Sequence, residues 1–283
     1  MSNKSYLSVY AKSFNWAGFF LPKKTFKKCS ALYDFCRVAD NIADDDDKIE
    51  NKEKKFFQFE DDFNQKNFSD PIIKNMWSLI EEFNISLKIV QDLLIGIKSD
   101  IKDKVKLNSK KDLLVYSYRV AGTVGLMMAK ILKVNKKSSL NSAIDLGIAM
   151  QLTNISRDVI EDSKNNRFYI NENFDEISST IYLADTFYKN SFYSIKHIPI
   201  TFRFSILVAR RVYRKIGYKI LSKKNLENYQ NSGKIYVSNI EKTLETFLSI
   251  FDLIKLLFSY KNDDQIQHDH NLINEEINLD ERI

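Results

Sequence analysis

Residues that make turns and cross-links are scarce in this chain. Its 283 residues include only 7 Gly and 3 Pro, whereas sandwiches, barrels and doubly wound sheets need many tight turns that draw on both. The two cysteines, Cys29 and Cys36, form no disulfide framework, and with only 3 His they predict no zinc site. This composition favours long helices joined by few turns, in a reduced, cytoplasmic protein.

Long apolar runs are lacking as well. Residues 1–22 contain no continuous apolar core of a signal peptide, and no uninterrupted apolar run approaches the ~18 residues of a membrane span. The stretch 247–258 is very apolar with sparse charges, which suits either a helix on a membrane surface or a helix inside a bundle. We favour the bundle and keep peripheral membrane contact as the alternative.

Charge is unevenly distributed along the chain. The net charge is +6, but residues 261–283 carry seven acids and two bases, which leaves 41 bases against 30 acids, or +11, for residues 1–260. A basic body suits nucleic acid, anionic lipid or a phosphorylated substrate. Lysine supplies 34 of the 43 cations, however, and lysine scattered over helix surfaces usually serves solubility. We expect no nucleic-acid partner.

Helical periodicity recurs almost everywhere. It predicts helices over 25–44, 48–66, 72–82, 86–104, 110–132, 137–162, 177–194, 200–221 and 235–259. Pro22, Pro71 and Pro199 each stand just before one of them, as expected of helix starts. No long alternating strand pattern, linker or repeat is present. We predict one all-α domain over residues 1–260, followed by an acidic, polar, loosely held tail over 261–283.

The first segment with chemical character is residues 33–44. At about 100° per residue, Tyr33, Arg37, Asp40 and Asp44 fall within a sector of roughly 60°, and the positions between them are mostly apolar. Two carboxylates and a guanidinium on one stripe indicate a site. The alternative is that the aspartates belong to the solvated acidic cluster Asp44–Asp47 that ends the helix.

The second segment is residues 151–162. Gln151, Asn154, Asp158 and Asp162 occupy one stripe roughly 80° wide, and the almost entirely apolar stretch 143–150 precedes them. Polar groups that continue a buried helix need partners. A bound ligand would supply them, and a self-satisfied polar network is the less favoured alternative.

Both segments share the spacing Asp-x-x-x-Asp, which places two carboxylates one helical turn apart. Mg²⁺ prefers a few carboxylates, several waters and substrate phosphates to a full protein cage. Facing pairs therefore predict a diphosphate held through Mg²⁺, with Mn²⁺ as a substitute. Di-iron bundles instead use Glu and Glu-x-x-His, and no such His exists here.

Arginine and aromatic placement agrees with a diphosphate site. Only nine arginines are present, and an arginine fork suits phosphate oxygens better than a lysine does. Aromatic faces can stabilise a carbocation left after a diphosphate departs. The candidates in or near the two segments are Arg37, Arg119, Arg157, Arg167, Tyr33, Tyr116, Tyr118, Phe168 and Tyr169.

These motifs resemble the squalene/phytoene synthase family over almost all of residues 5–260. The family's N-terminal signature is similar to Lys12-Ser13-Phe14, Phe20-Leu21-Pro22, Ala31-Leu32-Tyr33 and Phe35-Cys36-Arg37-Val38-Ala39-Asp40. Its central motif is similar to Tyr116-Ser117-Tyr118-Arg119-Val120-Ala121-Gly122-Thr123-Val124-Gly125, its second aspartate motif to residues 151–158 with Asp162, and its basic-aromatic element to Arg167-Phe168-Tyr169.

The resemblance implies the all-α isoprenoid synthase fold, a helical bundle around a central cavity, and the head-to-head joining of two prenyl diphosphates. In that reaction one diphosphate leaves, the other substrate's double bond captures the allylic cation, and a cyclopropylcarbinyl diphosphate forms and ionises in turn. By resemblance, Mg²⁺ and diphosphate are held by Asp40, Asp44, Asp158 and Asp162, and diphosphate oxygens are bound by Arg37, Arg157 and Arg167. The same site is lined by Gln151 and Asn154, and the diphosphate or the cations are contacted by Tyr33, Tyr116 and Tyr169. Prenyl chains approach the backbone at Ala121, Gly122 and Gly125, although close helix packing explains these glycines equally well.

Two departures from the family pattern bear on the site. The family usually has proline after the basic-aromatic element, where Ile170-Asn171 stands here, and it usually has arginine where Lys234 stands. A lysine still binds phosphate but lacks the fork, which makes Lys234 a weaker candidate for substrate binding.

The segment 209–217 and the Gly-Leu-Met-Met run after the central motif look most like bacterial phytoene synthases. Such an enzyme makes phytoene, a carotenoid precursor, from two geranylgeranyl diphosphates, and we expect it to need no nicotinamide. Squalene synthase, or a related enzyme that condenses farnesyl diphosphate, is the alternative within the family. A non-catalytic assembly factor of the same fold is the alternative from another class, against which the four aspartates argue. Prenyl chain length and oligomeric state stay open.

Overall fold

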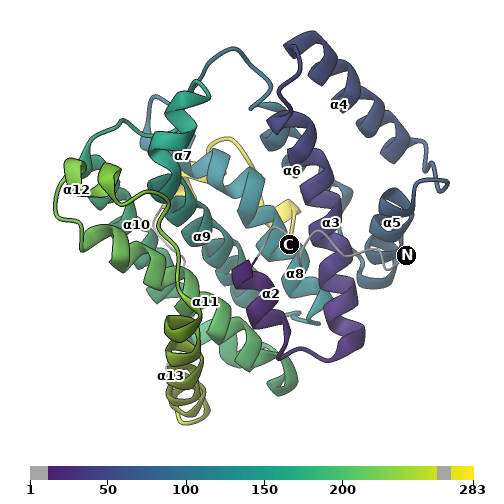
Figure 1. Cartoon of the computed structure of the whole chain (residues 1–283). Helices are drawn as coiled ribbons and strands as arrows, with labels where there is room; N and C mark the ends of the chain where they lie inside the picture. Colours follow the sequence, from purple (N-terminus) through teal and green to yellow (C-terminus); the bar gives the residue numbers. More distant parts are fainter. Residues whose placement is uncertain (1–11, 260–268) are drawn as a thin grey trace.

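Helices account for almost all of the regular structure (Figure 1). The computed structural model describes residues 12–259 and 269–283. Its helices are α2 (Lys12–Gly18), α3 (Lys23–Asp44), α4 (Ile49–Asn64), α5 (Pro71–Phe83), α6 (Leu87–Lys98), α7 (Lys110–Ser117), the π-helix η1 (Tyr118–Gly122), α8 (Thr123–Ile131), α9 (Lys137–Lys164), α10 (Phe174–Ser191), η2 (Tyr193–His197), α11 (Ile200–Leu221), α12 (Leu226–Asn231), α13 (Asn239–Leu257), α14 (His270–Asn274) and η3 (Leu279–Glu281). The predicted all-α class is confirmed.

The predicted helices exist, but several of their ends differ. The helix predicted over 86–104 ends at Lys98, and the chain then enters a two-residue strand, β1 (Val105–Lys106). This strand pairs in parallel with β2 (Arg167–Phe168), with Val105 opposite Arg167. Strands this short leave no alternating pattern in a sequence, which is why they were not predicted. The short helices α2 and α12 were not predicted either.

Local sequence explains most of the helix starts. Pro71 is the first residue of α5, and Asp70 before it accepts a hydrogen bond from the Ile72 amide. Pro22 and Pro199 occupy the N-cap positions of α3 and α11. The prediction that the prolines mark helix starts is confirmed.

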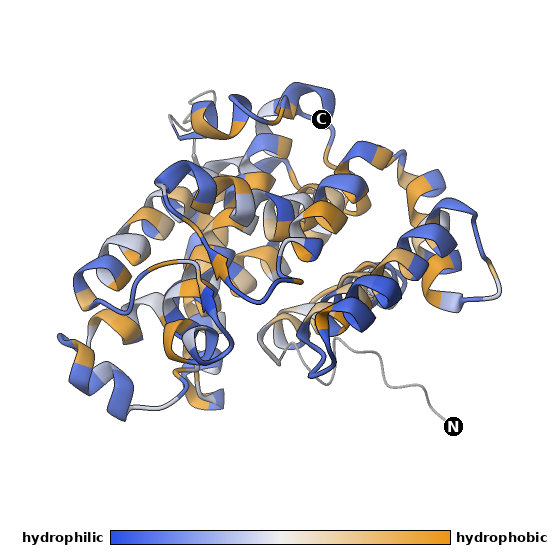
Figure 2. Cartoon of the chain, turned by 90° about the horizontal axis from the view of Figure 1, so that it is seen from above, coloured by the Kyte–Doolittle hydropathy of each residue, from blue (hydrophilic) through white to orange (hydrophobic). Residues whose placement is uncertain are grey.

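The 28-residue helix α9 packs against α8, η1, α10 and α11, and α3 packs against α4, α5, α6 and α8. Figure 2 shows that the hydrophobic residues gather mainly on the sides where helices face one another. The two cysteines lie in this interior as buried free thiols, as expected. Among residues 12–259 and 269–283, no helix combines the length and apolar character that crossing a bilayer requires.

Glycine permits a close contact between two helical segments. A methyl group on Gly147 would lie 2.2 Å from the Ala121 carbonyl oxygen, and one on Gly125 would lie 2.2 Å from the Ala143 carbonyl oxygen. These distances are far below van der Waals contact, so α9 and the η1–α8 segment approach each other backbone to backbone. Close helix packing, the alternative considered for the glycines of the central motif, accounts for Gly125.

The helix predicted over 110–132 is one helical run that contains a π-turn. The π-turn, η1, covers Tyr118 to Gly122 within the central motif. Tyr118 is fully buried, and its hydroxyl donates to Asp92 Oδ2 at 3.0 Å. Single π-turns inserted in α-helices often occur at functional sites.

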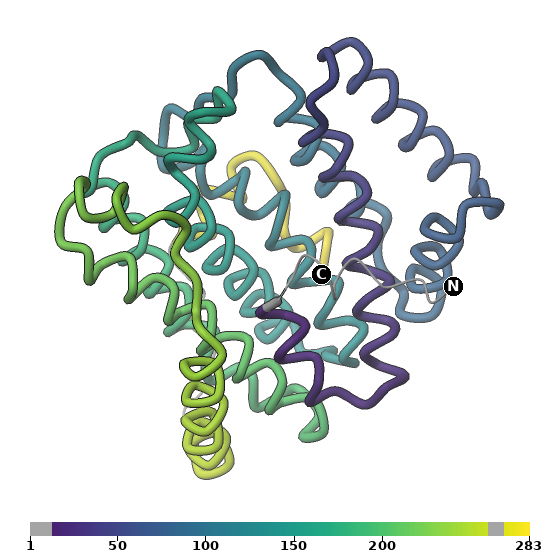
Figure 3. Tube along the Cα trace, viewed as in Figure 1, coloured from purple at the N-terminus to yellow at the C-terminus, as the bar shows by residue number. Residues whose placement is uncertain are grey.

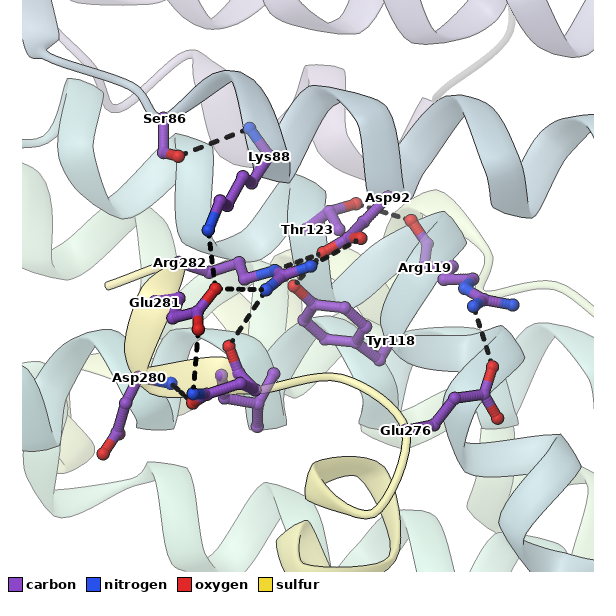
Figure 4. A network of polar contacts seen from close by, with 12 residues as sticks. Ser86, Lys88, Asp92, Tyr118, Arg119, Thr123, Glu276, Asp280, Glu281 and Arg282 are labelled. Carbon is purple, nitrogen blue, oxygen red and sulfur yellow. Dashed lines mark hydrogen bonds and ion pairs between the residues drawn. The ribbon is translucent and has the colours of Figure 1, made fainter.

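The C-terminal residues do not form a loosely held tail where the structure describes them. Residues 269–283 fold back over the middle of the chain, with α14 against α7 (Figure 3), and Ile273, Ile277 and Leu279 are buried. The Arg282 guanidinium binds Asp92 at 2.9 Å, so Asp92 joins the C-terminal segment to Tyr118 of the central motif (Figure 4). The expectation of a loose tail was wrong for these residues, because apolar side chains interleave with the acidic ones.

A buried histidine at the start of residues 269–283 attaches this segment to α9. His270 Nε2 contacts Asp145 Oδ1 of α9, and both side chains are almost inaccessible to solvent. Burial alone would lower the pKa of His270, but the charge and hydrogen bond of Asp145 outweigh it and raise the pKa above its ordinary value of 6.5. Burial also raises the pKa of Asp145. The folded pair therefore binds protons more tightly than the unfolded chain does.

Candidate active site

A cavity of about 250 Å³ opens where α3, α9, α7 and η1 meet the β2 strand. Its walls are polar except for Val120 and Ile155. Most of the predicted site residues line it together: Arg37, Asp40, Asp44, Tyr116, Gln151, Asn154, Arg157, Asp158, Asp162, Arg167 and Tyr169. Segments more than 100 residues apart thus contribute to one polar chamber.

The two Asp-x-x-x-Asp pairs both face this cavity. Burial raises the pKa of Asp40 to about 7, and the neighbouring charge of Asp44 adds to the effect. Burial likewise raises the pKa of Asp162 to about 7, with Asp158 adding to it. Five carboxylates, counting Asp100, stand against three guanidiniums in the lining. The chamber therefore carries an excess of negative charge that a cation would relieve.

The arginines hold the carboxylates in place. Arg167 donates to Asp44 Oδ1 at 2.7 Å and to the Ala43 carbonyl at 3.2 Å, which ties β2 to the end of α3. Arg157 forks onto the carboxylate of Asp158, with Nε 2.9 Å from Oδ1. Arg37 lies 4.0 Å from Asp44. Each guanidinium thus contacts an aspartate that lines the cavity.

Asp100 is a site residue that the sequence did not reveal. It lies two residues after the end of α6 and accepts hydrogen bonds from the hydroxyls of Tyr116 at 2.7 Å and Tyr169 at 2.9 Å. The two tyrosine rings stack with centroids 4.7 Å apart. Burial raises the pKa of Asp100 to about 6, and the two hydroxyls limit the rise. No spacing or motif marks this aspartate, because tertiary packing alone brings it to the cavity.

The donor set fits a hard divalent cation. Asn154 lines the cavity, and its buried Oδ1 atom accepts no hydrogen bond. The surrounding aspartates supply further oxygen atoms. Within the two described ranges, no three Asp, Glu, His or Cys side chains converge closely enough to hold a metal ion. Paired carboxylates that leave coordination positions for water and phosphate match the habits of Mg²⁺.

The other predicted residues lie outside the cavity lining. The Lys234 ammonium is 3.5 Å from Asp158 and 2.6 Å from Glu161, so it stands beside the site. Tyr33 is half-buried on α3, one turn before Arg37, and burial raises its pKa. Gly122 packs against Tyr118 and α9, and the Ala121 carbonyl faces α9 as described above. The structure thus places Ala121 and Gly122 in a helix contact.

Tyr229, in the helix α12 that was not predicted, contacts the backbone of α9 next to the site. Its hydroxyl lies 2.9 Å from the carbonyl oxygen of Ser156 and 2.8 Å from that of Arg157. This contact fixes the α9 backbone immediately before Asp158. Nothing in the sequence around Tyr229 indicates this role.

A mainly helical architecture with a polar cavity lined by two aspartate pairs and three arginines suits an enzyme that binds a phosphorylated substrate through a divalent cation. The family described as squalene/phytoene synthase matches residues 7–174, more than half of the chain. The chain belongs to this family, and it is an enzyme of the prenyltransferase type.

Similar proteins and solved structures agree with this family assignment. The chain is 28% identical over 247 residues to the 15-cis-phytoene synthase of Enterobacter agglomerans, covering 76% of this chain and 83% of the relative. It is 30% identical over 241 residues to the phytoene synthase of Cereibacter sphaeroides, covering 74% and 68%. A crystal structure of a dehydrosqualene synthase in complex with ligand superposes with a TM-score of 0.75 at 26% identity, covering 89% of this chain and 95% of that one.

Proposed function

We propose that this enzyme condenses two geranylgeranyl diphosphates head to head into phytoene, through a cyclopropylcarbinyl diphosphate, as a step of carotenoid biosynthesis. The observation that carries the proposal is the convergence of two Asp-x-x-x-Asp pairs and three arginines on one cavity. The similarity to phytoene synthases over about three quarters of the chain supports this choice of substrate and product.

Mg²⁺, or Mn²⁺ in its place, would be held by Asp40, Asp44, Asp158 and Asp162 with the Asn154 carboxamide oxygen nearby, and it would neutralise the charge of the departing diphosphate. Arg157 and Arg167 keep the aspartates oriented through the contacts described above. Lys234, with an ammonium group beside Asp158, adds a cation to which a diphosphate oxygen can bind.

The stacked rings of Tyr116 and Tyr169 line the chamber. Because their hydroxyls are bound to Asp100, the rings are fixed against rotation. Such fixed aromatic surfaces stabilise a developing allylic cation without supplying a nucleophile. Proton loss to the departed diphosphate would end the reaction, so no nicotinamide is required. The apolar product must leave for a lipid phase, so peripheral contact with a membrane fits this function.

Condensation of two farnesyl diphosphates is the second candidate. It is favoured by the structural similarity to the dehydrosqualene synthase, which extends over 89% of this chain. Purified protein given equal amounts of farnesyl and geranylgeranyl diphosphate with Mg²⁺ distinguishes the two. Phytoene synthase activity predicts a C40 hydrocarbon as the main product by mass, whereas a C30 hydrocarbon as the main product would contradict it.

A further inference from the structure

The helix α13 is amphipathic, but its polar face turns toward the protein and its apolar face turns toward solvent. Its inward face carries Lys242, Glu245 and Ser249, all buried, and Leu256 is the one apolar residue buried along the helix. Its outward face is apolar. Six residues at alternating spacings of four and three are each 46–84% exposed: Ile240, Leu244, Phe247, Phe251, Ile254 and Phe258. As expected for a helix of the bundle, α13 packs against α11, but its outward apolar face is exposed.

Exposed apolar residues on soluble proteins are normally scattered, and a contiguous apolar face marks an interaction surface. Only Asn239, Thr243 and Lys255 interrupt the exposed positions of α13 with polar side chains. In the view of Figure 1, α13 stands at one edge of the molecule and packs against α11 and η2 on its inward side. Nothing in the described chain covers its outward face.

A cationic pocket of about 350 Å³ lies beside this face, between α10, α11 and α13. Six cations line it: Lys189, Arg210, Arg211, Arg214, Lys215 and Lys255. Arg211 binds Asp252 and Glu245, and Arg214 and Lys189 share Asp185. Three carboxylates thus stand against six cations, and the other three cations have no carboxylate partner in the ion pairs of the described chain.

Arg210 is the most constrained of these cations. Only 4% of it is exposed, its guanidinium donates twice to the Tyr188 carbonyl at 3.0 and 2.8 Å, and it lies 4.8 Å from the centroid of the Phe192 ring. Burial lowers its pKa to about 10. A buried guanidinium without a carboxylate partner is costly, and an anion in the pocket would offset that cost.

The pocket and the apolar face meet at Lys255. Lys255 lines the pocket and lies one helical turn after Phe251 of the apolar face. A molecule with an anionic head and an apolar body would contact both surfaces at once. We infer that this combined surface docks the enzyme on an anionic phospholipid bilayer, with a lipid phosphate in the cationic pocket and α13 lying in the interface.

Charge favours a bilayer over a second copy of the chain. Residues 1–260 carry a net charge of +11, and a two-fold dimer through α13 would bring two such bodies, each with its pocket, close together. The alternating spacing of the apolar residues is that of a coiled coil, but it spans fewer than three heptads and lacks flanking charges of opposite sign. An anionic bilayer complements the same surface.

Vesicle binding without substrate tests this inference independently of the reaction. The full-length protein is sedimented with vesicles of phosphatidylcholine alone and of phosphatidylcholine mixed with phosphatidylglycerol. The variant Lys215→Ala/Lys255→Ala weakens the pocket and leaves Arg210 in place. The variant Phe247→Ser/Phe251→Ser makes the exposed face polar. The control Lys54→Ala/Lys74→Ala removes two exposed lysines of α4 and α5, at the opposite edge in Figure 1.

Wild type and control should bind the anionic vesicles and not the neutral ones. Each lysine near an anionic surface contributes about fivefold, so the pocket variant should bind roughly 25-fold more weakly. The face variant should lose at least about tenfold through its lost apolar contact. Unfolding midpoints of all four proteins are measured alongside, and the altered side chains are exposed or half-buried, so they should agree.

Three results would overturn the inference. Equal loss in the control and pocket variants would mean that only overall charge matters. A wild-type dimer that Phe247→Ser/Phe251→Ser converts to a monomer would assign the face to a second copy. Inorganic diphosphate that binds wild type but not the pocket variant, with no vesicle binding by either, would assign the pocket to a soluble anion.

Discussion

Replacing Asp158 with asparagine removes one charge from the cavity and keeps the shape of the side chain. In the folded protein this carboxylate is bound by Arg157 and lies 3.5 Å from the Lys234 ammonium. Two unit charges about 4 Å apart interact by about 4 kcal/mol at an effective dielectric constant near 20. Losing one carboxylate opposite a divalent cation should therefore lower kcat/KM about a thousandfold.

The assay is product formation from geranylgeranyl diphosphate over a series of Mg²⁺ concentrations. Asparagine still offers Arg157 an acceptor oxygen, so the free energy of unfolding should fall by no more than about 1–2 kcal/mol. The matched control is Asp61→Asn, on the exposed side of α4, which should leave the rate unchanged. A variant at position 158 within about tenfold of wild type, or full turnover in the presence of a chelator, would refute the reasoning.

Three further predictions concern the scaffold and the arginines. Gly147→Ala, whose methyl would meet the Ala121 carbonyl, should lower the free energy of unfolding in urea by about 1–3 kcal/mol; an unchanged midpoint would contradict the close contact. Because the raised pKa of His270 adds stability below pH 6.5 that is lost as the pH rises through the folded value, the advantage of wild type over His270→Gln should shrink with rising pH; an advantage that grows would reverse the assigned sign. Arg157→Lys should be harmful because lysine lacks the fork that holds Asp158, whereas Lys110→Ala should not, because it breaks only an exposed ion pair with Asp269; equal activities would show that the fork is irrelevant.

The carboxylate pairs were predictable because their spacing equals one helical turn. A long helix preserves that relation whatever the tertiary structure, so α3 and α9 present Asp40, Asp44, Asp158 and Asp162 as the sequence indicates. The apolar stretch before residue 151 further indicated that α9 would be buried. Periodicity and motif order thus located the fold class and most of the cavity lining.

Asp100 and Tyr229 were not predictable from the same rules. Asp100 follows the end of α6, and Tyr229 lies in the six-residue helix α12, so neither belongs to a periodic pattern. Both reach the site only because distant helices pack together. Residues 269–283 show a related limit: their acidic composition suggested a loose tail, whereas specific pairs such as Arg282 with Asp92 hold them on the body.

The face of α13 shows why an amphipathic pattern alone leaves its orientation open. Periodicity identifies an apolar stripe, but the partner of the polar stripe decides which side turns inward. Here Arg211 of α11 binds Glu245 and Asp252 of α13. These ion pairs turn the charged side of α13 inward and its apolar side outward. The arginine lies 34 and 41 residues before these carboxylates in the sequence, so no local rule connects them.

The most direct test of phytoene-type condensation is one incubation of the purified protein with geranylgeranyl diphosphate and Mg²⁺ in the absence of any nicotinamide. The product is analysed by mass and by its ultraviolet spectrum. Quenching of the rearranged allylic cation by proton loss predicts a C40 hydrocarbon with a central conjugated triene, formed without a reductant. Accumulation of the cyclopropylcarbinyl diphosphate, which is converted to product only when NADPH is added, would contradict this mechanism. It would indicate a squalene synthase activity instead.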